Sequence, residues 1–122
     1  MKIAITSSGS DLKSKVDPRF GRCAYFILVE TDTDEFEAVE NTAAQGMGGV
    51  GIQSGQIMAD REVKTVLTGS CGPNAFQTLQ AAGIKVITGV SGTVQEAIDK
   101  FKSGDYKTIS QADASAHSGM KK

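Results

Sequence analysis

The sequence has almost no net charge and no long apolar run. Its 122 residues carry a formal net charge of −1, so the chain lacks the basic surface that attracts nucleic acids and anionic membranes. Its longest apolar run falls far short of the roughly 20 residues needed to cross a bilayer. A strand-like segment follows Met1-Lys2 directly, which argues against a signal peptide. We therefore expect one cytoplasmic domain that binds neither nucleic acid nor membrane.

Residues that commonly build catalytic centres are equally scarce. The chain has one histidine, His117, whose place near the C-terminal end favours a solvated role, and two cysteines, Cys23 and Cys71. A reducing compartment argues against a disulfide between them. The sequence contains no Gly-x-Ser-x-Gly elbow, phosphate-loop lysine motif or Cys-x-x-Cys pair, and residues 2–6 include no acid for nuclease chemistry. We expect a protein that is not an enzyme, and a hydrolase with a concealed site is the weakest alternative.

Glycine, by contrast, is abundant, with 14 residues in the chain against an average usage of about 7%. Short apolar runs between the glycines predict strands at 2–6, 23–30, 35–40, 63–67 and 85–88. Helical periodicity predicts a helix at 52–60 and another at 73–82, which Gly83 terminates. It also predicts a third helix, which begins with a capping box of Thr93 and Glu96 and ends before Gly104. This order of elements predicts a mixed sheet with helices on its faces.

The most informative stretch is the turn at residues 69–75, Gly-Ser-Cys-Gly-Pro-Asn-Ala. It joins an apolar strand to a helix whose first turn accommodates Pro73. Such a turn brings backbone N–H groups and the Cys71 thiol to one spot, which suits an anion or a soft metal. Glycine-rich loops also lie at 7–22 and 89–92. Because the carboxyl ends of parallel strands share one edge, we expect these loops to form a binding rim.

Several motifs, taken together and in order, resemble one known family. They are Asp-Pro-Arg-Phe-Gly-Arg at 17–22, the glycine-rich stretch 46–51, the turn 69–75, and the segment 83–86 leading to 91–94. Over residues 1–104 the chain is similar to the dinitrogenase iron–molybdenum cofactor biosynthesis family. This family includes NifX-type accessory proteins, the C-terminal region of NifB-type proteins and the molybdenum–copper orange proteins. We expect residues 105–122 to form a disordered polar tail.

The resemblance implies both a fold and a function. The fold is a three-layer, ribonuclease H-like α/β arrangement whose mixed five-stranded sheet has the order 3-2-1-4-5, with strand two antiparallel. The function is non-catalytic binding or carriage of an anionic metal–sulfur cluster, either an iron–molybdenum cofactor precursor or a molybdenum–copper cluster, with protein partners in cofactor assembly. As a stand-alone domain, the chain is expected to lack the radical-SAM activity of full-length NifB-type proteins.

The chain departs from the family pattern at one position. Many members carry histidine where this sequence has Arg19, so the first loop is a poor candidate for direct metal ligation. Arg19 and Arg22 instead offer forked donors to sulfide or oxo groups, or they pair with Asp11 or Asp17. Arginine at this position places the chain nearer the orange-protein-like group.

The predicted cluster-binding residues lie in three loops and are Arg19, Arg22, Gly46, Gly48, Gly49, Ser70, Cys71, Gly72 and Asn74. Cys71 is the predicted metal ligand, although packing beneath the helix start explains this residue equally well. Packing is the favoured interpretation of Cys23. The glycines at 46–51 either form a plain connection or let a bulky cluster approach the backbone.

A second function remains open at this point. A regulatory or protein-interaction module with the same fold could have lost cluster binding, and the absence of a histidine in the first loop favours that interpretation slightly. A partner that binds equally well after substitution of Cys71 and Arg22 would distinguish it from a cluster carrier.

Overall fold

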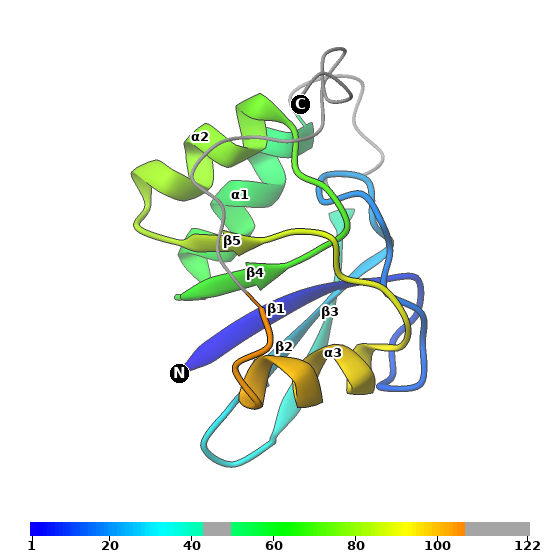
Figure 1. Ribbon diagram of the computed structural model, residues 1–122. Coiled ribbons are helices and arrows are strands. Elements are labelled where there is room, and N and C mark those ends of the chain that lie inside the picture. The colour runs from blue at the N-terminus through cyan, green and yellow to red at the C-terminus, as the bar shows by residue number, and fades with distance from the viewer. Residues whose placement is uncertain (43–49, 107–122) are drawn as a thin grey trace, which may run out of the picture.

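The chain folds into three layers, with a central sheet between a pair of helices and a single helix (Figure 1). The computed structural model describes residues 1–42 and 50–106. Its elements, in chain order, are β1 (Lys2–Ser7), β2 (Tyr25–Glu30), β3 (Phe36–Glu40), α1 (Val50–Asp60), β4 (Thr65–Leu67), α2 (Pro73–Ala81), β5 (Lys85–Ile87) and α3 (Val94–Lys102). The predicted order of strands and helices is confirmed.

The sheet contains five strands in the order β3-β2-β1-β4-β5. β2 is antiparallel to both β1 and β3, whereas β1, β4 and β5 run parallel to one another. Ile3 lies opposite Thr65, and Thr65 lies opposite Lys85, which fixes the register of the parallel strands. The predicted sheet order and the antiparallel second strand are therefore confirmed.

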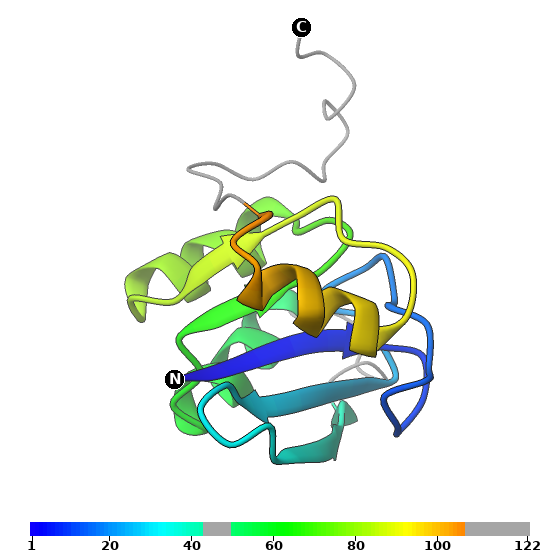
Figure 2. The ribbon, with the colours of Figure 1, turned by 60° about the horizontal axis from the view of Figure 1, so that its bottom comes forward.

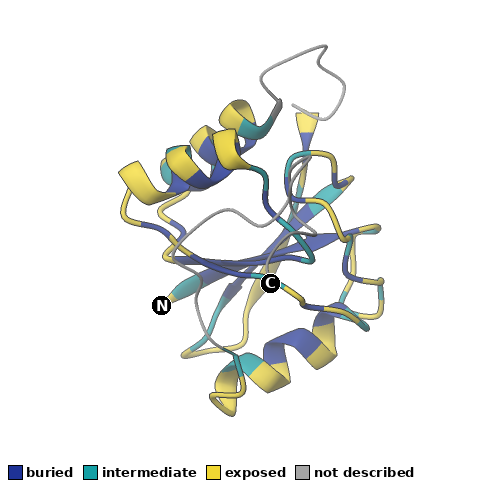
Figure 3. Cartoon of the chain, turned by 45° about the horizontal axis from the view of Figure 1, so that its top comes forward, coloured by how far each residue is buried: buried dark blue, intermediate teal, exposed yellow. Residues whose placement is uncertain are grey.

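Both faces of the sheet are covered, which explains why the inner strands are apolar throughout rather than alternating. Ala4 and Val66 belong to a buried cluster on the side of α1 and α2. Ile5 and Leu67 belong to a second cluster on the side of α3. Figure 2 shows α3 lying across the sheet, and Figure 3 shows buried strands between helices whose outer faces are exposed. The core is therefore divided in two by the sheet.

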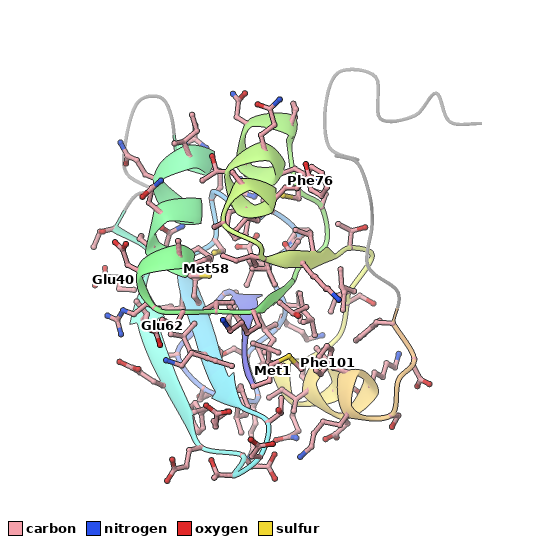
Figure 4. The ribbon with its side chains drawn as sticks, turned by 90° about the vertical axis from the view of Figure 1, so that its left-hand side faces the viewer. Met1, Glu40, Met58, Glu62, Phe76 and Phe101 are labelled. Carbon is pink, nitrogen blue, oxygen red and sulfur yellow. The ribbon has the colours of Figure 1, made fainter. Side chains whose placement is uncertain are left out.

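The α1–α2 pair depends on small residues at its crossing. A Cβ atom added to Gly55 of α1 would lie 2.7 Å from Cγ2 of Thr78 in α2. Close approach of the two helices lets Met58 and Phe76 fill the space above the sheet, on the side opposite Phe101 of α3 (Figure 4).

α2 ends as the sequence predicts. Gly83 has a φ of 76°, a conformation that favours glycine. Its N–H group donates to the Gln80 carbonyl at 3.0 Å, and the Ile84 N–H donates to the Leu79 carbonyl at 2.9 Å. These paired bonds satisfy carbonyls of the last turn and direct the chain into β5.

α3 begins with the predicted capping box. The Thr93 hydroxyl accepts a hydrogen bond from the Glu96 N–H at 3.1 Å, and the Glu96 carboxylate accepts one from the Thr93 N–H at 2.9 Å. The bond from the Thr93 backbone lowers the pKa of the Glu96 carboxyl below its ordinary value. The start of α3 is thus fixed by its own side chains.

Two strands begin two residues later than the apolar pattern predicts. β2 begins at Tyr25 instead of residue 23, since Tyr25 pairs with Ser7, the last residue of β1. β4 begins at residue 65 instead of 63, because Glu62 has a φ of 63° and turns the chain out of α1. Cys23 and Val63 are nevertheless buried. Burial, rather than strand pairing, accounts for apolar residues beyond the strand ends.

Beyond α3 the described chain reaches Tyr106, which packs against the α3-side cluster. Of the predicted tail at 105–122, residues 107–122 lie outside the described residues. None of the helices in the described ranges has the length and apolar character required to span a bilayer.

Candidate functional site

The loops that leave β1, β4 and β5 meet at one edge of the sheet, on the right in Figure 1. The first loop, residues 8–24, contacts both of the others. Arg19 forms a bridge with Ser70 after β4, and Lys15 forms one with Thr93 after β5. The structure therefore brings together, at one rim, loops that are far apart in the sequence.

Hydrogen bonds fasten the first loop to the turn after β4. The Phe20 N–H donates to the Ser70 carbonyl at 3.2 Å, and the Ser70 hydroxyl donates to the Pro18 carbonyl at 3.0 Å. Gly69 permits this approach, since a Cβ atom there would lie 2.6 Å from Cα of Pro18. The hydroxyl of Ser70, a predicted contact of the metal–sulfur cluster, therefore donates its hydrogen bond to the first loop.

Buried hydroxyl groups support the rim from below. The Thr6 hydroxyl, at the end of β1, donates to the Asp17 carbonyl at 2.7 Å and lies 2.9 Å from the hydroxyl of Thr68. Both threonines are fully buried. The sequence does not single them out, because threonine at a strand end is typical of any sheet. Their bonds fix where the first loop leaves the sheet.

Two helices begin near this rim, and their N-terminal N–H groups differ in how they are bonded. At α3, the first two N–H groups donate to carbonyls of the first loop, both at 2.9 Å. At α2, the N-cap residue Gly72 provides no side-chain bond. The N–H groups of Asn74 and Ala75 have no backbone acceptor within residues 1–42 and 50–106. N–H groups without backbone partners at a helix start are the kind that attract anions, and in the described part of the chain α2 has them where α3 does not.

Arg19 and Arg22 supply positive charge to the first loop. The Arg19 side chain is 63% exposed, and its Nε lies 3.6 Å from the Asp17 carboxylate. Arg22 is exposed and forms no ion pair with any residue in the described part of the chain. The predicted pairing with Asp17 is therefore found for Arg19. The Asp11 carboxylate instead accepts hydrogen bonds from Lys13 and Ser14 in the same loop.

Both cysteines lie in the cluster beneath α1 and α2. Cys71 is 1% exposed and Cys23 is fully buried. Burial, with a smaller contribution from the charge of Asp17, raises the pKa of the Cys23 thiol to about 12, so this thiol stays protonated near neutral pH. Among the described residues no three His, Cys, Asp or Glu side chains gather as a metal site. The described residues at the rim therefore supply hydrogen-bond donors but no such group of metal ligands.

A buried polar cluster at the base of the first loop escapes prediction from the sequence. The Asn41 amide nitrogen donates to the carbonyls of Gly21 at 3.1 Å and Cys23 at 2.9 Å. The Ser54 hydroxyl of α1 lies 3.4 Å from the Gly21 carbonyl and 3.3 Å from the Asn41 amide oxygen. One sequence feature could have indicated this cluster: Ser54 is a polar residue on the same helical face as the apolar Met58.

The remaining predicted residues divide between two groups. Gly72 and Asn74 lie at the N-cap and in the first turn of α2. Gly46, Gly48 and Gly49 lie outside the described residues. The described site therefore consists of Arg19, Arg22 and the 70–74 turn.

Residues 1–104 match the sequence profile of the family described as dinitrogenase iron–molybdenum cofactor. The chain belongs to this family. An uncharacterized protein of Methanocaldococcus jannaschii is 34% identical over 107 residues, which span 85% of this chain and 87% of that protein. The family predicted from the motifs is thus confirmed.

Solved structures of similar proteins have the same fold. The apo form of the orange protein from Desulfovibrio gigas superposes with a TM-score of 0.90 at 39% identity, covering 93% of this chain and 96% of that one. A NifB-like protein of the DUF35 family from Thermotoga gives a TM-score of 0.78 at 43% identity, covering 88% and 91% of the two chains. The family's three-layer α/β architecture is therefore the architecture of this chain.

Proposed function

We propose that this protein binds and carries a preformed anionic metal–sulfur cluster without catalysing a reaction. The cluster is an iron–molybdenum cofactor precursor or a molybdenum–copper cluster. Membership of the cofactor family supports the class of ligand, and similarity to a protein known in an apo form supports a bound state. The proposal places the protein in the cytoplasm, with protein partners in cofactor assembly.

The observation that carries the proposal is the position of the first loop against the start of α2. The bridge between Arg19 and Ser70 brings a loop with two arginines next to N–H groups that lack backbone acceptors in the described chain. Guanidinium groups offer forked donors to sulfide or oxo ligands, and a helix N-terminus adds partial positive charge. An anionic cluster meets donors from both directions at this rim.

The donor set favours a cluster that arrives complete. Assembly from metal ions needs several thiolate, imidazole or carboxylate ligands, and the described residues gather no such group. Hydrogen-bond donors recognise the sulfide or oxo surface of a finished cluster instead. In this proposal Cys71 becomes a ligand only when the 69–72 turn moves, because the thiol is buried. Gly46, Gly48 and Gly49 remain predicted backbone contacts.

Anaerobic reconstitution with tetrathiomolybdate and copper(I), followed by metal analysis and visible absorption spectra, tests the proposal. We expect stoichiometric uptake by the unaltered protein. Loss of a charge-assisted hydrogen bond, worth about 1.5–3 kcal/mol, should weaken uptake about 10- to 100-fold in Arg22→Gln. Lys13→Gln, which removes an exposed charge from the same loop, is the matched control. Absence of uptake by the unaltered protein would refute the proposal.

A protein-interaction module that has lost cluster binding is the second candidate function. The observation in its favour is the burial of Cys71 within the core cluster. This candidate predicts that the isolated protein takes up no cluster. It also predicts that a physiological partner binds Cys71→Ala and Arg22→Ala variants as tightly as it binds the unaltered protein.

A further inference from the structure

Asn41, at the end of β3, bonds to the backbone on both sides of Arg22. Its amide nitrogen donates to the carbonyl of Gly21 at 3.1 Å and to that of Cys23 at 2.9 Å. Its backbone N–H donates to the Ala24 carbonyl at 2.9 Å. One buried residue therefore holds the main chain immediately before and after an exposed arginine.

The chemistry of these neighbours determines how the amide is oriented. Two carbonyl oxygens accept on one side, so the nitrogen with its two protons must face them. The amide oxygen then faces the Ser54 hydroxyl of α1, 3.3 Å away. Ser54 also lies 3.4 Å from the carbonyl of Gly21. The network thus links the end of β3, the first loop and α1.

We infer that Asn41 is a positioning residue of the proposed cluster site, fixing the Gly21–Cys23 backbone and with it the direction in which Arg22 leaves the loop. This inference rests on the proposed function. Arg22 has no ion pair of its own in the described chain. Its placement therefore depends on its backbone, and Asn41 is the side chain that bonds that backbone on both sides.

Few side chains could replace Asn41. Aspartate has nearly the same shape, but it would bring carboxylate oxygens against the two carbonyl oxygens and supply no donor. Alanine would leave buried carbonyls without their bonds, at a cost that favours rearrangement of the loop. In either variant Arg22 keeps its charge and loses its fixed position.

The first test uses the protein without cluster and measures backbone ¹⁵N order parameters. We expect Arg22 to have an order parameter near 0.85, the value of a rigid backbone, and to fall toward about 0.6 in Asn41→Ala. Ile98→Val, which perturbs the core on the other side of the sheet, is the control for general destabilisation and should leave Arg22 unchanged. A rigid Arg22 in Asn41→Ala would overturn the inference.

The second test measures uptake of tetrathiomolybdate and copper(I). Changes to residues that orient ligands typically weaken metal binding about 10- to 100-fold, and we expect Asn41→Ala to fall in that range. Since Asn41 acts through Arg22, the Asn41→Ala/Arg22→Gln double variant should bind no more weakly than Arg22→Gln alone. Additive losses would show that Asn41 acts by another route and would contradict the inference.

The two tests separate failure of the inference from failure of the proposed function. If the unaltered protein takes up no cluster, the proposed function fails, and the Arg22 order parameter still decides the positioning role. If Asn41→Ala does not fold, Ser54→Ala replaces it, since this smaller change removes the donor to the Asn41 amide oxygen. Arg22 should then lose part of its order, and an unchanged order parameter would overturn the inference.

Discussion

The two arginines of the first loop differ in whether an acidic side chain lies close enough to balance their charge. Arg19 lies beside a carboxylate, with 3.6 Å between its Nε and Asp17, and the Asp17 side chain is only 12% exposed. Part of the Arg19 charge is therefore balanced within the loop. Arg22 lacks such a counter-charge in residues 1–42 and 50–106, so it should contribute more than Arg19 to binding an anion.

Gly69→Ala should separate the two loops of the site. The added Cβ would lie 2.6 Å from Cα and 2.7 Å from the carbonyl oxygen of Pro18, a backbone overlap that side-chain rotation cannot relieve. We expect a loss of about 1–3 kcal/mol in the free energy of unfolding, together with weaker cluster uptake. Urea denaturation and reconstitution measure the two effects.

Gly83→Ala is the matched control for that variant. It replaces a glycine with a φ of 76° and open space around it, so it should cost about 1–2 kcal/mol through backbone strain alone. Uptake by the folded fraction should be unchanged. Equal uptake by the Gly69→Ala and Gly83→Ala variants would show that the contact between the loops does not shape the site.

Cys23 should make the folded state sensitive to alkaline pH. Its pKa is about 12 in the folded protein against an ordinary value of 9.0, so the unfolded chain loses this proton first. The stabilisation is complete below pH 9 and declines as pH rises toward 12, by up to about 1.4 kcal/mol per pH unit. The unfolding free energy of Cys23→Ala should lack this decline between about pH 9 and pH 10.5. Parallel pH profiles for the two proteins would contradict the prediction.

Sequence reasoning finds residues whose type and local context point to chemistry, and it misses those whose role depends on distant partners. Arg19 and Ser70 are both predicted contacts, and the structure places them side by side. Asn41 reaches partners 20 and 18 residues away, and no local pattern marks a buried amide with such partners. The predicted glycines at 46–49 stay predictions.

At the scale of whole elements, α2 and α3 differ in how their first N–H groups are bonded. The first loop supplies backbone acceptors to α3, and no described residue supplies backbone acceptors to the N–H groups of Asn74 and Ala75 in α2. Carbonyls of the first loop accept the opening N–H groups of α3, at 2.9 Å, and Thr93 and Glu96 complete the cap. α2 starts from Gly72 without a side-chain cap. An anion at this rim should therefore bind at α2 rather than α3.

The α1–α2 crossing supplies a prediction about stability. Gly55→Ala should cost about 1–3 kcal/mol, because its Cβ would lie 2.7 Å from Cγ2 of Thr78. Thr78→Ser removes that methyl group and keeps the hydroxyl that donates to the Asn74 carbonyl at 3.1 Å. The double variant should recover most of the loss, as a thermodynamic cycle from urea denaturation would measure. Additive losses would mean that the two helices do not meet at this pair.

The order of the elements is predictable from the sequence, but the residues at which the strands begin and end are less so. Apolar runs and helix caps carry the order of strands and helices, because burial on both sheet faces leaves a continuous signal. The same signal extends β2 back to Cys23, which is buried without belonging to the strand. Hydrogen-bond pairing with a neighbouring strand decides where a strand ends. That neighbour is distant in the sequence, so the residues of one segment do not reveal the pairing.

At the scale of the whole molecule, the sheet separates two buried clusters, and the proposed site lies on the side of only one of them. Cys71 and Phe20 belong to the cluster on the α1 and α2 side, whereas Tyr106 packs on the α3 side. Stability and binding should therefore respond differently to changes on the two sides.

Truncation after Tyr106 or after Gly104 tests this division. Removal of residues 107–122 should leave the melting temperature and cluster uptake unchanged, as expected for a polar tail. Removal of residues 105–122 also deletes the half-buried Tyr106 ring and should cost about 1 kcal/mol, again without loss of uptake. Calorimetry of both truncated proteins provides the measurement. Equal stability of the two would contradict the packing role of Tyr106.

The bonds that join the rim have a consequence for the order of events during synthesis. Thr6 and Thr68 are 62 residues apart in the chain, and Pro18 and Ser70 are 52 apart. The arginine loop leaves the ribosome well before its partner, and chains grow at roughly 5–20 residues per second. For several seconds the nascent polypeptide therefore carries both arginines and no rim. Under the proposed function, we expect the cluster to bind only after α2 has been translated and the loops have met.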